Sequence, residues 1–73
     1  MSIMEQVADE LAQETVRLIE DGTDDAIIRE VADAIQNASQ TMSEEYLNAV
    51  RIRRAELRAR AVLERAGSNE ADG

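Results

Sequence analysis

Residues 42–66 have the sequence MSEEYLNAVRIRRAELRARAVLERA, which contains neither glycine nor proline and is rich in helix-favouring residues. When these residues are placed about 100° apart on a helix, the apolar ones form two stripes on different sides. The first stripe consists of Leu47, Val50, Leu57 and Ala61. The second consists of Ile52, Ala55, Ala59, Val62, Leu63 and Ala66. A helix with two apolar sides needs two packing partners, and we expect one small chain to cover only one of them.

The expected bounds of this long helix are residues 42–66. Thr41 and Glu44 have the spacing of a capping box, in which a hydroxyl and a carboxylate satisfy the free amides of a helix start. Gly67 is suited to end the helix. At roughly 1.5 Å per residue, the helix would be about 37 Å long. The tail that follows, residues 68–73, is small, polar and acidic, and we expect it to be disordered.

Another capping-box pair, Ser2 and Glu5, precedes a first helix that we expect over residues 3–21. Gly22 is suited to the left-handed conformation that often follows a helix end. The apolar residues of this segment spread over more than half of the helix circumference. A single neighbouring helix would not cover all of them.

We expect a second helix over residues 24–38, with Thr23 as its N-cap. Its apolar residues lie on one side and its polar residues on the other. The apolar stripe consists of Ile27, Val31, Ala34, Ile35 and Ala38, with Ile28 beside it. This pattern is typical of a helix that buries one side only.

The composition predicts a single all-α domain that needs support from outside its own core. A chain of 73 residues buries only roughly 60% of its unfolded surface. It has no cysteine for a disulfide and no histidine for a structural zinc site, so oligomerisation is the remaining common support. We therefore expect a three-helix unit, with a hairpin of the first two helices followed by the long helix, assembled into a dimeric helical bundle.

Charge is distributed unevenly along the chain. Residues 1–45 contain twelve acidic residues and two arginines, a net charge of −10, whereas residues 46–67 contain six arginines and two acidic residues, a net charge of +4. Such asymmetry favours contact with another copy of the chain, with another protein, or with both. It does not identify the partner.

Four arginines, Arg51, Arg54, Arg58 and Arg65, lie on one side of the long helix. They could pair with acidic residues of the other helices, in the same chain or in a partner chain, and this is the interpretation we favour. They could instead bind phosphates. The net charge of −8 and the lack of interleaved lysine, tyrosine or phenylalanine argue against direct nucleic-acid binding.

The acidic residues of the first two helices allow a different interpretation. Asp24, Asp25, Glu30 and Asp33 could present carboxylates that imitate the phosphates of a nucleic acid and block a protein that binds it. A solvated acidic face, which contributes mainly to solubility, is the commoner explanation of such a pattern. The sequence leaves both open.

No catalytic, cofactor or metal motif is found. The acidic segment from Asp21 superficially resembles a calcium-binding EF-hand loop, but Ala26 and Ala32 occupy the positions that require glycine and glutamate. A thin aliphatic bundle also offers little room for a dry catalytic cleft, so we do not expect an enzyme. No apolar run approaches the roughly 20 residues of a membrane-spanning helix, and the acidic N-terminal segment is unlike a secretion signal. We expect a cytoplasmic protein.

Tyr46 is the only aromatic residue of the chain. It could anchor a protein contact, because tyrosine is common in binding hot spots. We favour packing of its ring on the edge of the core, with the hydroxyl group in water.

These observations predict a non-enzymatic protein-binding module that acts as a homodimer, regulating or inhibiting a partner protein by occupying its surface. The alternatives are an acidic nucleic-acid mimic and a self-assembling building block. The residues expected to form the contacts are Arg51, Arg54, Arg58, Arg65, Ile52, Leu57, Val62, Leu63, Asp24, Asp25, Glu30 and Asp33.

Overall fold

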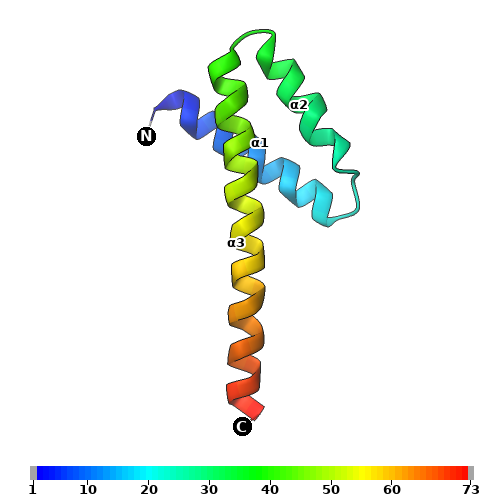
Figure 1. Cartoon of the computed structure of the whole chain (residues 1–73), viewed down its shortest axis with the longest axis vertical. Helices are drawn as coiled ribbons and strands as arrows, with labels where there is room; N and C mark the ends of the chain where they lie inside the picture. Colours follow the sequence, from blue (N-terminus) through cyan, green and yellow to red (C-terminus); the bar gives the residue numbers. More distant parts are fainter. Residues whose placement is uncertain (1, 73) are drawn as a thin grey trace.

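The computed structural model describes the backbone of residues 2–72 and the side chains of residues 2–68. Within these residues there are three helices and no strand, which confirms the all-α prediction. The helices are α1 (Ile3–Glu20), α2 (Ala26–Gln36) and α3 (Gln40–Asp72). The first half of α3 packs against α1 and α2, and its second half extends away from them (Figure 1).

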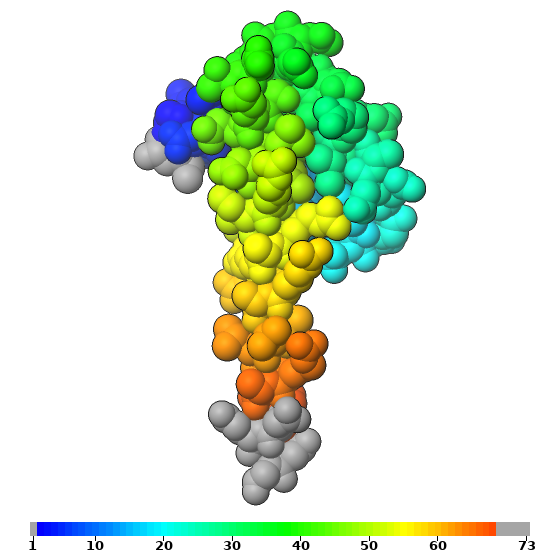
Figure 2. Space-filling model, viewed as in Figure 1, coloured from blue at the N-terminus to red at the C-terminus, as the bar shows by residue number. Residues whose placement is uncertain are grey.

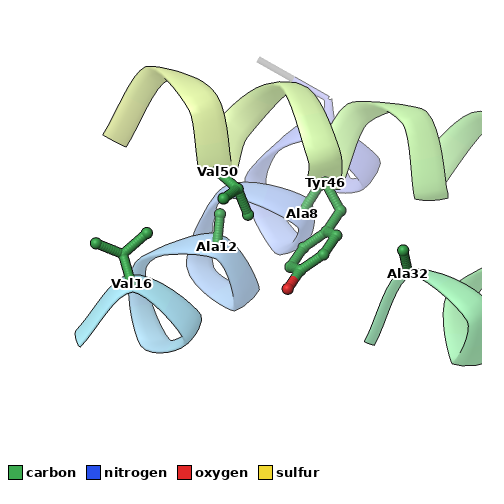
Figure 3. Packing of buried hydrophobic residues seen from close by; sticks show 6 residues of the cluster. All are labelled: Ala8, Ala12, Val16, Ala32, Tyr46 and Val50. Carbon is green, nitrogen blue, oxygen red and sulfur yellow. The ribbon is translucent and has the colours of Figure 1, made fainter. Parts of the chain in front are cut away.

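The predicted hairpin of the first two helices is wrong. Helices α1 and α2 scarcely contact one another, and each packs on α3 instead. The reason is the side chain of Tyr46, which is fully buried and lies between Ala8 and Ala12 of α1 and Ala32 of α2 (Figure 3). Because these three neighbours are alanines, the aromatic ring of α3 fills the space that a direct contact between α1 and α2 would occupy.

Buried hydrogen bonds fix the position of α3 on both neighbours. The Thr15 hydroxyl donates to the Leu11 carbonyl oxygen at 2.9 Å, so the Tyr46 hydroxyl is the donor in its 2.8 Å bond to Thr15 Oγ1. On the other side, Ser43 Oγ donates to the Ala32 carbonyl oxygen at 2.9 Å. Tyr46 thus packs in the core as expected, but its hydroxyl group is buried rather than in water.

The start and end of α1 agree closely with the sequence. Ser2 Oγ accepts a hydrogen bond from the Glu5 backbone amide at 3.1 Å, as an N-cap does. Helix α1 ends at Glu20, one residue before the predicted end, and Gly22 has a φ of 115°. This left-handed conformation is the one that glycine adopts without steric cost.

Helix α2 is shorter than predicted, and its buried side is shifted around the helix so that only part of the predicted stripe packs against the core. It begins at Ala26, and the residue at its N-cap position is Asp25 rather than Thr23, without a side-chain cap hydrogen bond. The Ala26 amide donates instead to Asp24 Oδ1 of the preceding loop at 2.8 Å. The buried residue is Ala32, and the apolar residues packed around it are Ile28, Val31 and Ile35. The predicted stripe members Ala34 and Ala38 are exposed. Ala32 faces α3, and because its side chain is small, the Ser43 hydroxyl of α3 can reach the Ala32 carbonyl oxygen of α2.

Helix α3 is longer than predicted at both ends. It begins after Ser39, whose hydroxyl accepts from the Met42 amide at 3.1 Å, so the predicted Thr41 cap is displaced by two residues. It continues through Gly67 to Asp72, where the sequence predicts an end at residue 66 and a disordered tail. Gly67 does not adopt the positive φ that would end the helix. A glycine that keeps the helical conformation lowers helix stability but does not stop the helix. Gly73 lies outside the described residues.

The long helix gives the molecule an asymmetric shape. The dimensions are 53 × 29 × 13 Å, because α3 projects beyond the part where all three helices meet (Figure 2). We call the part formed by α1, α2 and residues 40–54 the head, and residues 55–68 the projecting segment. Every described side chain of the projecting segment except Glu56 is exposed.

Alkaline pH provides a direct test of the Tyr46 position. Burial raises the pKa of the Tyr46 hydroxyl above its ordinary value of 10.0, so the unfolded chain ionises first. The stability that follows from this difference is complete below pH 10 and is lost as the pH rises towards the folded-state pKa. Across this range the free energy of unfolding should fall by about 1.4 kcal/mol per pH unit.

The measurement is unusually clean because the chain has no lysine, cysteine or histidine, so Tyr46 is the only side chain that titrates between pH 8 and pH 12. Urea unfolding at several pH values should show the decline in the wild type and a flat profile in Tyr46→Phe. An equal decline in both proteins would contradict a buried Tyr46 hydroxyl.

Candidate protein-binding surface

The second apolar stripe of α3 is exposed along its whole length. Ile52, Val62 and Leu63 have 59%, 54% and 69% of their surface accessible. The alanines of the same stripe, Ala55, Ala59 and Ala66, are exposed as well. The head does not cover this stripe, because α1 and α2 pack on the side of α3 that carries Tyr46 and Val50.

The first stripe is covered only along the part of α3 that belongs to the head, residues 40–54. Val50 is buried and Leu47 is partly buried, whereas Leu57 is 40% exposed and Ala61 is exposed. Leu57 lines an open groove of about 370 Å³ between the C-terminal half of α1 and α3, together with Val16. The structure therefore separates the predicted binding residues, because Leu57 lies beside α1 and the second stripe lies on the other side of the helix.

The arginines predicted to bind a partner have different environments. Arg54 Nη2 lies 3.3 Å from Asp25 Oδ2, so one predicted basic residue and one predicted acidic residue pair within the chain. Among the side chains described, no carboxylate pairs with Arg51 or Arg58, and both are exposed. Arg65 is also exposed, further along the projecting segment. Pairing with the acidic helices thus accounts for Arg54 only.

The predicted acidic residues form an open surface on the head. Asp24, Glu30 and Asp33 are exposed, and so is Asp25 apart from its contact with Arg54. The Asp24 carboxylate also accepts a hydrogen bond from the Ala26 amide at the start of α2. This surface lies on the solvent side of α2 and its preceding loop, away from the second stripe of α3.

The shortest ion-pair contact among the described side chains was not among the predicted sites. Arg53 binds Asp9 of α1 with two hydrogen bonds, from Nε to Oδ1 at 2.9 Å and from Nη2 to Oδ2 at 2.6 Å. Arg53 also contacts Glu56, which in turn contacts Arg60 at 2.9 Å. The spacing of Arg53, Glu56 and Arg60 along the helix could have suggested this cluster. Asp9 could not have been found, because its pairing depends on how α1 crosses α3.

This cluster changes the acidity of its members. The two hydrogen bonds from Arg53 lower the pKa of Asp9 below its ordinary value of 3.8. Hydrogen bonds from Arg60 and then Arg53 lower the pKa of Glu56. The hydrogen bond with Asp9, and after it the one with Glu56, raises the pKa of Arg53. Asp9 and Arg53 have side chains only about a third exposed, so this pair fixes α1 on α3 more firmly than a surface pair would.

Other kinds of site find little support in the described residues. They contain no group of three or more acidic, histidine or cysteine side chains placed to hold a metal ion. The larger grooves, including one of about 560 Å³ beside Asp9 and Ile52, are open to solvent. No described helix combines the length and the apolar character that crossing a bilayer requires.

Comparison with known proteins adds no information about function. No protein-family model matches the chain, and neither a curated protein nor a solved structure is significantly similar to it.

Acid titration tests the pair between α1 and α3. The stability contributed by the lowered pKa of Asp9 is complete above the unfolded pKa and is lost as the pH falls through the folded-state value. Asp9→Asn should lower the free energy of unfolding by about 1 kcal/mol at pH 7 and reduce the loss of stability below pH 4. Glu10→Gln removes the same charge from an exposed neighbouring position and serves as the control. Identical urea unfolding curves for the two variants at pH 7 would argue against the pair.

Proposed function

We propose that the protein is a non-enzymatic protein-binding module that works as a homodimer and regulates or inhibits a partner protein by occupying its surface. The observation that carries this proposal is the exposure of Ile52, Val62 and Leu63 along one side of α3. Fully burying one such side chain is worth roughly 1.5 to 3 kcal/mol. A chain of this size has a small margin of stability, so an interface that covers the stripe would be a substantial gain.

The polar surfaces support the same proposal. Arg51 and Arg58 flank the exposed stripe and have no carboxylate partner among the described side chains. The acidic surface of Asp24, Glu30 and Asp33 belongs to the head. A partner protein could therefore bury the apolar stripe of α3 and also contact the arginines beside it or the acidic residues of the head. Charges at the rim of an interface act mainly on specificity and association rate. The cytoplasmic location stays a prediction.

Mimicry of a nucleic acid is the second candidate, and the exposure of Asp24, Glu30 and Asp33 is the observation that favours it. Their carboxylates lie on a helix and its preceding loop, without an arginine partner among the described side chains. The two candidates predict different partner-binding residues, which an experiment can separate.

Partner capture from a lysate of the native host distinguishes these candidates. The bait is the wild-type chain, compared with Arg51→Ala/Arg58→Ala and with Asp24→Asn/Glu30→Gln/Asp33→Asn. Loss of a captured protein with the arginine variant only supports the general binding module. Loss with the acidic variant only, for a partner that binds nucleic acid, supports mimicry. If both variants retain every captured protein, neither the arginines nor the acidic residues bind a partner, and both candidate functions are contradicted.

Replacement of Leu63 tests whether the exposed stripe forms the dimer. Leu63→Glu should leave the helical content close to that of the wild type, because Leu63 is 69% exposed in the single chain, and should convert a dimer into a monomer in sedimentation equilibrium. It should also lower the urea midpoint at concentrations at which the wild type is dimeric, because the stability contributed by the interface is lost. Ala61→Glu is the matched control, because it adds the same charge to the projecting segment on a different side. An open-ended series of masses for the wild type would favour the building block instead.

A further inference from the structure

The exposed stripe of α3 has the spacing of a coiled-coil seam. Alternating steps of three and four residues connect Ile52, Ala55, Ala59, Val62 and Ala66. In a heptad written abcdefg, these residues occupy the a and d positions that face a partner helix. All five are exposed. The seam covers only two heptads and contains three alanines, so it fits a close but weak helix pair.

The geometry of the head leaves room for a second helix. Val50 is buried against α1, and at about 100° per residue Ile52 and Ala59 lie roughly 180° to 200° away from it. The seam is therefore turned away from the side of α3 that carries Val50. A partner helix can lie along residues 52–66, and at Ile52 it would lie next to the open groove that Glu5 and Asp9 of α1 line.

The charges beside the seam select one direction of pairing. Arg51, Arg58 and Arg65 each precede an a-position residue and so occupy g positions, while Glu56 and Leu63 occupy e positions. In a parallel pair, a g residue faces the e residue five positions later in the other chain. Arg51 then faces Glu56 of the second copy, and the aliphatic stem of Arg58 covers Leu63 of the second copy.

An antiparallel pair brings like charges together. With Ile52 opposite Val62 of the second copy, g residues face g residues and e residues face e residues. Arg58 then faces Arg58, Arg51 faces Arg65, and Glu56 faces Glu56. Each of these contacts is repulsive, and the arginine contacts have no compensating carboxylate nearby on the same side.

The Glu56 carboxylate is able to accept a further donor. It already binds Arg53 and Arg60 within its own chain, at 3.1 Å and 2.9 Å. Two carboxylate oxygens provide about four acceptor sites, and the Glu56 side chain remains 36% exposed. The guanidinium group of a neighbouring chain can therefore share it.

We propose that the partner of this stripe is a second copy of the chain, aligned in parallel as a two-stranded coiled coil over residues 52–66. This proposal rests on the homodimer of the proposed function and specifies its geometry. Both heads then lie at the same end of the coiled coil, on opposite sides of it. The dimer displays two acidic α2 surfaces towards a common partner.

Disulfide trapping tests the direction of pairing, and the absence of cysteine from the chain makes each introduced thiol unique. In a parallel pair Ala66→Cys meets itself, so it should form a covalent dimer in a glutathione redox buffer. In the antiparallel pair residue 66 lies opposite residue 48, and the two copies of residue 66 are about 27 Å apart at 1.5 Å per residue. Glu64→Cys, which lies away from the seam, is the control and should remain reduced.

The converse experiment mixes Asn48→Cys with Ala66→Cys. A disulfide between the two different chains as the main product, or equal trapping of Glu64→Cys, would overturn the parallel arrangement. Far-UV circular dichroism of the reduced proteins establishes that each variant is folded.

A charge reversal provides a second measurement that does not depend on a disulfide. Arg51→Glu places two carboxylates together in the parallel pair, so the dimer dissociation constant should rise on the order of tenfold. In the antiparallel pair the same change replaces a contact of two arginines by an ion pair, and the dimer should become tighter. Tighter association of Arg51→Glu would therefore overturn the proposal.

Failure of this proposal is distinguishable from failure of the proposed function. A wild-type chain that sediments as a monomer at all concentrations up to the millimolar range would remove the homodimer and the coiled coil together. A wild-type dimer with the antiparallel disulfide pattern would leave the homodimer intact and remove only the parallel arrangement.

Discussion

The contact of Tyr46 with α1 and α2 is the interaction on which the architecture depends. Tyr46 is the largest fully buried side chain among those described, and the other buried apolar residues are three alanines and two valines. Its ring separates α1 from α2, and its hydroxyl donates to Thr15, which in turn donates to the backbone of α1. Among the described side chains, no buried polar atom lacks a partner. The core therefore gains an aromatic ring without leaving the hydroxyl unsatisfied, which would be costly in so small a protein.

The small size of this core explains why α3 carries so much uncovered apolar surface. Asp25 of the loop before α2 lies beside Arg54, Val16 of α1 lies beside Leu57, and an open groove that Glu20 lines extends to Ala61. Beyond this point the chain has no further element to place on α3. The bidentate pair of Arg53 and Asp9 lies near the end of the covered part, and it orients α1 where apolar contacts become few.

The sequence predicted the parts of the fold that depend on local signals. Gly22 and Ser2 mark the limits of α1 because a left-handed residue and a hydroxyl cap act within one turn of the helix. The two stripes of α3 were visible because they need only the helical period. The wrong predictions concern contacts between elements, namely the hairpin of α1 and α2 and the inclusion of Ala34 and Ala38 in the buried side of α2. Both were decided by Tyr46 and Ser43, whose neighbours cannot be read from spacing.

The same distinction applies to the candidate site. Exposure of Ile52 and Leu63 followed from the two-stripe pattern, whereas the pairing of Asp9 with Arg53 required the crossing of α1 and α3. Leu57 belongs to the first stripe and was also expected to contact a partner, and the structure places it beside Val16 in an open groove. Periodicity identifies which residues share a side of a helix, and it does not say which side the rest of the chain covers.

A parallel dimer must also tolerate the repulsion between two acidic heads, since each chain has a net charge of −8. Two packed helix axes are about 8 to 10 Å apart, and α1 and α2 lie on the outer side of each α3. Most charges of one head are thus separated from those of the other by more than the Debye length of about 8 Å at physiological ionic strength. Arg51 and Glu56 of opposite chains would be in direct contact, where salt screens little. In the proposed dimer the short-range charges beside the seam would therefore outweigh the distant ones, and the direction of pairing would depend on the charged residues at the g and e positions, which are Arg51, Arg58, Arg65 and Glu56.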